Sequence, residues 1–314
     1  MMTPFFILLT LQAVLTPALS PLFVGIIRKL KAKLQGRNGA GIFQPYRDLW
    51  KLFHKDEVIS WDASWIFRVA PYIVFAVTVV VGASIPLFVV SLKGYGLGDL
   101  VSVVYLLALG TFFLALAGMD TGGAFGGFGS SREMTLAALT EGGLLFALLV
   151  ASFLARSTNL FVIAGSVAPL FFVSFVPVLL AFSAFIIALL SETARFPFDN
   201  PATHLELTMV HEAMILEYSG KRLALMEWAS ANKLFIFLAL GVNVFFPWGI
   251  ASTPTVAAVS GAIIALLLKA LIISAGIAVL ESSIAKFRFF RLPDLLFASF
   301  LLSLIALNII IITL

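Results

Sequence analysis

Residues 256–280 read VAAVSGAIIALLLKALIISAGIAVL and contain a single ionisable side chain, Lys269. A helix needs about 20 consecutive apolar residues to cross the hydrocarbon core of a bilayer. This stretch is long enough and apolar enough to do so. It therefore predicts a membrane-spanning α-helix, and the same criterion can be applied to the rest of the chain.

The whole chain has the composition of a membrane protein. Of its 314 residues, 61% are hydrophobic and 11% are charged, and the mean hydropathy is +1.10. A soluble domain carries about 25% charged residues, and a soluble chain this apolar would aggregate. We predict an all-α polytopic membrane protein that forms a single membrane domain over residues 1–314. Eight transmembrane helices are expected at 3–27, 67–92, 100–118, 136–155, 169–190, 233–250, 256–280 and 294–313.

The first apolar segment is expected to be a retained helix rather than a cleaved signal peptide. A signal peptide begins with a basic region, whereas here the basic cluster follows the apolar run. The chain has no cysteine, so it holds no disulfide, Cys-ligated zinc or iron–sulfur cluster of its own. The three histidines, His54, His204 and His211, are too scattered to suggest a metal site, and we expect no cofactor in this chain.

The Lys and Arg residues predict the orientation. Eight spans place four loops on one side of the membrane, at 28–66, 119–135, 191–232 and 281–293. These loops and their edges hold 17 of the 20 Lys and Arg residues, whereas the opposite side holds Lys93 and Arg156. The positive-inside rule then puts the four loops in the cytoplasm and both termini outside. The pI of about 9.4 reflects this topology rather than nucleic-acid binding, because no base-reading motif accompanies it.

Ionisable residues inside the spans or at their inner ends are candidates for an ion path. Each charge costs about 2.5–3.5 kcal/mol on insertion scales, so function is the default explanation for its presence. A chain of carboxylates and a lysine between helices can pass protons through hydrogen-bonded water. The alternative is that the same groups form buried ion pairs that orient the helices. The candidates are Glu133, Glu141, Glu192, Lys269 and Glu281.

The third inner loop is the richest in polar residues. It runs from Ser191 through Asp199 to Gly220 and is rich in acids and histidines. Leu205, Met209 and Ala213 are spaced by four, which predicts a helix at about 202–216 that lies on the membrane surface. A solvated amphipathic helix would explain most of these side chains equally well. The titratable residues are Asp199, His204, Glu206, His211, Glu212 and Glu217.

The remaining loop features exclude two function classes and indicate docking. The glycines of 36–41 follow a membrane helix rather than a strand, and no Walker motif is present, so we expect no nucleotide binding. No internal repeat of the kind that marks a secondary transporter is visible. Long ordered loops are usually functional, and all the long polar loops are on one side, which indicates that this side docks a partner.

Four loop motifs, taken in order, resemble one family. The segments 37–52 (RNGAGIFQPYRDLWKL), 118–133, 192–199 (ETARFPFD) and 217–220 (EYSG) are similar to motifs of the subunit 1 family of respiratory complex I. Gly118–Gly122 and Gly129–Glu133 look like the branch found in energy-converting group 4 nickel–iron hydrogenases, of the hydrogenase-4 component C and formate hydrogenlyase subunit 4 type. The resemblance covers most of the chain.

The resemblance implies a role and a set of residues. In this family the subunit anchors a cytoplasmic redox arm and couples electron transfer there to ion movement in antiporter-like membrane subunits. The acids that match family positions along the ion path are Glu133, Glu141, Glu192, Asp199, Glu206 and Glu217. The matching loop residues expected to contact the redox arm are Arg37, Gln44, Asp48, Lys51 and Arg195.

The match also has gaps. Where the family has an E-A-E run after P-F-D, this chain has Ala202-Thr203-His204, so two acids of the path are missing and His204 is expected to replace one of them. Asn38 and Ala40 stand where Arg and Pro are common. These departures are also compatible with a divergent branch of the family, in which the redox arm is not a hydrogenase.

The family resemblance thus favours a non-catalytic coupling subunit of a redox-driven proton or sodium pump in a prokaryotic cell membrane, which composition alone does not distinguish from a transporter. Expected partners are hydrogenase-like large and iron–sulfur subunits, which would hold iron–sulfur clusters and a nickel–iron centre, and antiporter-like membrane subunits. Two alternatives stay open. One is a quinone-binding subunit of a complex I-like oxidoreductase, and the other is a stand-alone ion transporter.

Overall fold

The computed structural model describes residues 2–91, 98–170, 174–199 and 209–313. The described chain is helical, and the prediction of an all-α membrane protein is confirmed. Its elements are α1 (Met2–Leu34), α2 (Gln44–Phe53), α3 (Trp65–Ser84), α4 (Leu100–Asp120), α5 (Ala124–Ala155), α6 (Leu160–Leu170), α7 (Phe175–Glu192), α8 (His211–Ile215), α9 (Gly220–Phe245), α10 (Val256–Ser283), the 3₁₀ turn η1 (Phe289–Arg291) and α11 (Leu292–Thr313).

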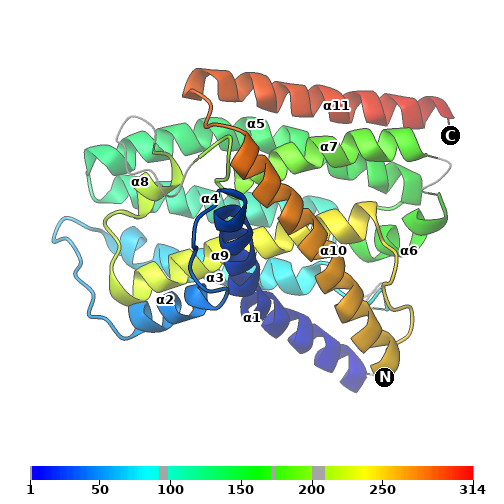
Figure 1. Cartoon of the computed structure of the whole chain (residues 1–314), viewed down its shortest axis with the longest axis horizontal. Coiled ribbons are helices and arrows are strands. Elements are labelled where there is room, and N and C mark those ends of the chain that lie inside the picture. The colour runs from blue at the N-terminus through cyan, green and yellow to red at the C-terminus, as the bar shows by residue number, and fades with distance from the viewer. Residues whose placement is uncertain (1, 92–97, 171–173, 200–208, 314) are drawn as a thin grey trace.

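Eight of these helices are long and apolar enough to cross a membrane within the described residues. Helices α4, α5, α7 and α11 run nearly parallel, whereas α1 and α10 cross the bundle obliquely (Figure 1). Helix α11 packs on α5 and α7, and α4 packs between α3 and α5. Helix α9 contacts both α3 and α1, which places the oblique α1 against the parallel part of the bundle.

Pro21, inside α1, leaves a backbone carbonyl that the bundle satisfies from outside the helix. Pro21 has no N–H to donate to the carbonyl of Pro17, four residues earlier. The indole Nε1 of Trp228 in α9 donates to that Pro17 oxygen instead, at 2.9 Å. A neighbouring helix therefore supplies the missing donor, as membrane helices with internal proline require.

The predicted span at 67–92 is too long. Helix α3 ends at Ser84, because Pro86 disfavours the helical conformation of the residue before it and lacks an N–H. The following residues are extended and buried, and Val89 forms a parallel bridge with Ala251. Asn243 of α9 donates through its side-chain amide to Pro86 O at 2.7 Å and Leu87 O at 2.8 Å. This non-helical backbone is thus satisfied inside the protein.

Several predicted loops are partly helical. Helix α5 begins at Ala124 and takes up most of 119–135, and α9 begins at Gly220 and takes up the end of 191–232. A short helix, α6, occupies the predicted outer loop at 156–168. Of the surface helix expected at 202–216, only the described part from His211 to Ile215 can be compared, and it forms α8. Helices α5 and α9 thus extend beyond their apolar stretches, whereas α6 and α8 are separate short helices, and hydropathy over a membrane-length window reveals neither.

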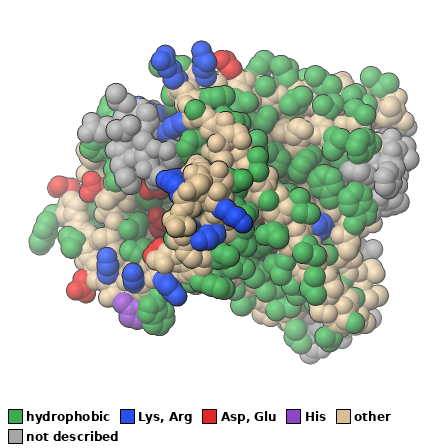
Figure 2. Space-filling model, viewed as in Figure 1, with side chains coloured by type: hydrophobic (Ala, Val, Ile, Leu, Met, Phe, Trp, Pro, Cys, Tyr) green, Lys and Arg blue, Asp and Glu red, His purple; other side chains and the backbone are tan. Residues whose placement is uncertain are grey.

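Charged side chains gather at one end of the molecule. Figure 2 shows Lys, Arg, Asp and Glu over the end that carries α2 and α8, while hydrophobic side chains cover most of the opposite half. This is the end of the bundle to which the predicted cytoplasmic loops belong.

Candidate functional site

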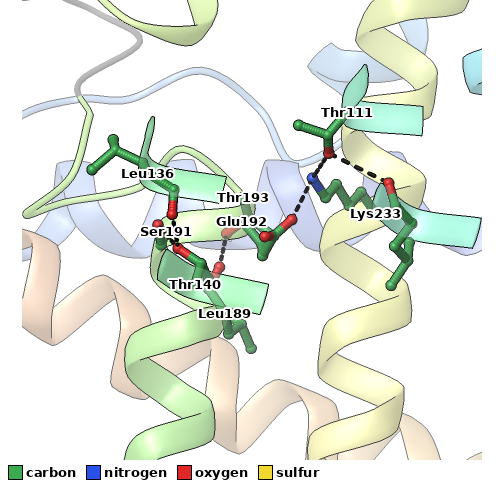
Figure 3. A network of polar contacts seen from close by, with 9 residues as sticks. Thr111, Leu136, Thr140, Leu189, Ser191, Glu192, Thr193 and Lys233 are labelled. Carbon is green, nitrogen blue, oxygen red and sulfur yellow. Dashed lines mark hydrogen bonds and ion pairs between the residues drawn. The ribbon is translucent and has the colours of Figure 1, made fainter. Parts of the chain in front are cut away.

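The centre of the site is a buried ion pair between two helices. Glu192, the last residue of α7, places Oε2 2.7 Å from Nζ of Lys233 in α9. The same ammonium donates to Thr111 Oγ1 of α4 at 3.1 Å, as Figure 3 shows. The carboxylate side chain is 7% exposed and the lysine side chain 17% exposed. Burial of both charges inside the spans requires that they be paired, because an isolated ion would be strongly destabilised there.

Hydroxyl groups continue the polar region from Glu192 toward α5. Ser191 Oγ and Thr140 Oγ1 lie 2.8 Å apart, and Thr140 also donates to Leu136 O at 2.8 Å (Figure 3). Glu133 lies seven residues before Thr140, two helical turns along the same face of α5, and both are buried. Glu141 follows Thr140 directly and is half-buried. Three of the predicted path residues, Glu133, Glu141 and Glu192, are therefore grouped in this part of the bundle.

A small cavity of about 40 Å³ adjoins the ion pair. Its lining includes Glu192, Lys233, Thr111, Thr78 and His211. About 10–15 Å³ of such space accommodates one water molecule when polar partners are present, so this cavity is large enough for water.

A wider cavity of about 510 Å³ lies on the loop side of the small one. It brings together Asp199 and Glu281 of the predicted path with Arg37, Asp48 and Arg195, which were predicted to contact a redox arm. Its lining also includes Arg28, Glu212 and Glu227, of which Glu212 was named from the sequence only as a titratable residue of the third inner loop. Thr193, His211 and Ser230 line both cavities, so a single layer of side chains separates them.

The first residues of α8 carry two titratable groups with opposite pKa shifts. Burial lowers the pKa of His211 to about 4, and the nearby Lys233 adds to this effect, so His211 is neutral at pH 7. Burial raises the pKa of Glu212 to about 7, with Glu227 and Asp199 contributing. A carboxyl that titrates near neutrality on a cavity wall can accept and release protons at working pH.

Besides Glu192, two of the predicted path acids are held in ion pairs. Asp199 lies 2.7 Å from Lys286 Nζ and accepts the backbone N–H groups of Val210 and His211 at 3.3 and 3.0 Å. Glu281 pairs with Arg195 at 2.8 Å and with Lys31 at 3.1 Å. These contacts tie the loop after α7 to α1, α8 and the end of α10, which is the helix-orienting role considered above for such charges.

Other predicted residues lie elsewhere. Lys269 of α10 donates to Val242 O, Asn243 Oδ1 and Phe246 O at 3.4, 3.0 and 2.9 Å, and so caps the last turn of α9. Glu217 and Lys51 are exposed, and Gln44 bonds Asp48 within α2 at 2.8 Å. His204 and Glu206 lie outside the described residues.

The acidic and histidine side chains of the site are spread out rather than clustered. Within the described ranges no three His, Asp or Glu side chains are grouped to hold a metal ion. The side chains that are present can exchange protons and form ion pairs, and this is the chemistry that the arrangement supports.

Sequence comparisons connect the chain to membrane subunits of redox enzymes. A family model described as NADH dehydrogenase matches residues 6–313. The chain is 36% identical to Hydrogenase-4 component C of Escherichia coli (strain K12), over 94% of this chain and 92% of that protein. It is 34% identical to Formate hydrogenlyase subunit 4 of the same organism, over 92% and 94%. It is 30% identical to one subunit of the NADH-quinone oxidoreductase of Paraburkholderia xenovorans (strain LB400), over 66% of this chain and 60% of that protein.

A solved structure has the same fold. A chain in the structure of the membrane-bound sulfane sulfur reductase, described as an archaeal respiratory membrane complex, superposes with a TM-score of 0.84. The match covers 97% of this chain and 99% of that chain at 21% sequence identity. At this identity the likeness concerns the fold alone.

Proposed function

Because this chain belongs to the NADH dehydrogenase family, whose model it matches over residues 6–313, we propose that it is the anchoring and coupling subunit of a multisubunit, redox-driven ion pump. The two relatives that match over nine-tenths of both chains are named as hydrogenase components, which favours an energy-converting hydrogenase or a hydrogenase-related complex. In this role the subunit links electron transfer in a cytoplasmic arm to proton or sodium translocation. It performs no redox chemistry itself.

The observation that carries the proposal is the pair of cavities with a shared wall. The wide cavity holds charged groups of the loop side, and the small cavity reaches the buried pair of Glu192 and Lys233. A redox-linked change of charge in the wide cavity is therefore separated from the Glu192–Lys233 pair only by the layer of Thr193, His211 and Ser230. Such short-range electrostatic coupling between a loop-side event and an intramembrane charge is what a coupling subunit requires.

The proposed ion path has three stages. Glu212 and Glu227 receive the ion on the wall of the wide cavity, with Asp48 nearby. Lys233 and Glu192 form the middle stage, where protonation of the carboxylate would release the lysine. Glu133 and Thr140 then lead along α5 to the half-buried Glu141, where the ion leaves toward a neighbouring membrane subunit. Asp199, Glu217, Glu281 and Lys269 were also predicted for the path, and their contacts support a structural role for Asp199, Glu281 and Lys269.

The proposed partners follow from the same role. The end that carries the wide cavity would face the cytoplasm and bind iron–sulfur and catalytic subunits, which hold the metal centres. Antiporter-like subunits would adjoin α5 in the membrane of a prokaryotic cell, with both termini of this chain outside. The 17 Lys and Arg residues of the inner loops and their edges support this orientation.

A quinone site is the second candidate. Small-molecule pockets measure about 300–1,000 Å³, and the wide cavity is of this size. Its many charged side chains favour an ion-handling role, since ligand pockets are lined mainly by apolar groups.

The experiment that tests the proposal is a mild-detergent pull-down of the chain from its native membrane, with mass spectrometry and metal analysis. Nickel, iron and antiporter-like subunits are the expected result. Iron without nickel would support a related redox complex with another acceptor, such as a quinone. A chain that purifies alone and free of metal would overturn the proposal and favour a stand-alone transporter.

A further inference from the structure

The connection between α2 and α3 presents bulky apolar side chains to solvent. This connection, residues 54–64, is called here the anchor loop. Trp61 is 102% exposed and Val58 is 78% exposed, and Trp61 has the highest exposure of the large hydrophobic side chains in the described residues. Trp50 before the loop and Trp65 after it are also exposed. Three of the chain's five tryptophans are therefore exposed within one short region.

The first half of the loop is fixed to the start of α9. Ser219 Oγ accepts the N–H of Val58 at 2.9 Å and donates to its carbonyl at 3.1 Å. Glu57 lies 2.6 Å from an Arg222 guanidinium nitrogen. Gly220, at φ +54°, lets the backbone approach so closely that an added Cβ would lie 2.9 Å from Asp56 O. These contacts hold Val58 in place without covering its side chain.

The second half is fixed to the ends of α3 and α4. Asp120 Oδ2 accepts the N–H groups of Ser64 and Phe67 at 2.8 and 3.3 Å. Ala63 is buried, and Ile59 packs against the same small core. Some side chains of the loop, such as Ala63 and Ile59, thus pack inward and hold it in place, whereas Val58 and Trp61 point outward and are exposed to solvent. The exposure of Trp61 is built into the fold.

The position and charge of the loop favour a protein over the lipid surface. Helix α3 begins only at Trp65, and its exposed Arg68 marks the polar side of the bilayer boundary. Figure 1 shows the loop reaching beyond α5 and α9 at the end of the bundle. The charged side chains of the loop, all exposed, are Lys55, Asp56, Glu57 and Asp62, and an anionic bilayer surface would repel this net negative set.

We infer that Val58 and Trp61 are a preformed docking anchor for a peripheral subunit of the same complex, which receives Trp61 in an apolar pocket with a basic rim facing Asp56 and Asp62. This inference rests on the proposed function and adds the residues that hold the redox arm. Tryptophan is enriched among the few interface residues that dominate binding energy. A rigid loop also avoids the entropy loss that a flexible one would suffer on binding.

The first test replaces Trp61 in the complete complex. Trp61→Ala should weaken retention of the peripheral subunits by about 30-fold or more, the effect expected of a dominant interface residue. Trp61→Phe should retain most of the binding. The matched control is Trp248→Ala, because Trp248 is 43% exposed beyond the opposite end of α9. Equal retention of the peripheral subunits in Trp61→Ala and the wild type would overturn the inference.

The second test uses the absence of cysteine from the chain. Ser60→Cys places one thiol beside Trp61, and Ser252→Cys places one at the exposed opposite end. A charged maleimide should modify the cysteine at position 60 in membranes stripped of peripheral subunits but not in the intact complex. The cysteine at position 252 should react equally in the two samples when the reagent can reach that side of the membrane. Reaction at position 60 in both states, or protection in both, would overturn the inference; the latter would place the loop in the bilayer.

The two proposals fail in different ways. If the chain is not part of a redox complex, the wild type itself retains no peripheral subunit. If only the anchor is wrong, the wild type retains its partners and Trp61→Ala retains them equally.

Discussion

Lys233 Nζ lies 2.7 Å from Glu192 Oε2 and 3.1 Å from Thr111 Oγ1, so one ammonium joins α9 to the end of α7 and to the middle of α4. Removal of either charge would leave the other buried without its partner. The pair thus links stability and ion transfer, and the two effects can be separated by mutation.

Lys233→Met should destabilise the subunit by roughly 3–5 kcal/mol, because it leaves Glu192 as an uncompensated buried charge. The double variant Glu192→Gln with Lys233→Met should recover most of that stability and still block ion translocation. Thermal unfolding of the purified complex and ion uptake into vesicles measure the two effects. Normal translocation in the double variant would remove the pair from the path.

Glu141→Gln should leave the complex assembled and its redox reaction active when uncoupled, yet abolish proton or sodium translocation. The reason is that an amide cannot take up and release a proton at the proposed exit. Glu217→Gln is the matched control, since Glu217 is exposed and should tolerate the change. Fully coupled activity in Glu141→Gln would contradict the proposed route.

Glu212 should make stability depend on pH. Its pKa is raised from 4.5 to about 7 in the folded protein, so the stability linked to its neutral form is complete below pH 4.5. That contribution is lost as pH rises through about 7. The thermal midpoint should therefore fall less between pH 5 and pH 8 in Glu212→Gln than in the wild type. Identical pH profiles would show that Glu212 does not titrate in this range.

Lys269→Met should lower stability by about 1–3 kcal/mol, because the carbonyls of Val242 and Phe246 would lose a charged donor. Ion translocation per electron should be unchanged in the folded fraction. Thermal unfolding and vesicle transport test this pair of expectations. Loss of coupling with normal stability would return Lys269 to the ion path.

Charge reversal at Arg37 or Asp48 should weaken attachment of the redox arm, since both side chains line the wide cavity that such an arm would cover. Co-purification of peripheral subunits measures the effect. The exposed Lys51, which is absent from that lining in the described chain, provides a comparison through Lys51→Glu. A smaller loss with Lys51→Glu is expected.

The membrane fold could be predicted from the sequence because hydropathy is a local property. The eight spans and the family resemblance, which rested on four loop motifs, are both confirmed. Boundaries were less predictable. Pro86 ended α3 early, and α9 began well before its apolar stretch. The recurrence of Ala224, Ala231 and Leu238 at intervals of seven, all of them buried, was a signal that this helix continued upstream of Lys233.

The site was only partly predictable. Glu133, Glu141 and Glu192 stood out because a carboxylate inside a span is costly wherever it lies. Lys233 did not, since at the edge of an apolar run it resembled the basic residues of the loops. Its role depends on Glu192 and Thr111, which are distant in sequence. Glu212 and His211 were interpreted as side chains of a solvated surface helix, and Glu227 was not considered. Only the packing of α8 and α9 around the wide cavity places these three groups in its wall.

Under the proposed function, the wall formed by Thr193, His211 and Ser230 would also set the barrier to ion leakage. Each elementary charge that crosses a potential of 100 mV releases about 2.3 kcal/mol, so an open water file through the protein would discharge the cell. The wall consists of two hydroxyl groups and an imidazole that is neutral at pH 7, and these three side chains carry no charge. A wall without a fixed charge would make the transfer of an ion between the cavities costly, so we expect an idle complex to keep the gradient that it builds when electrons flow.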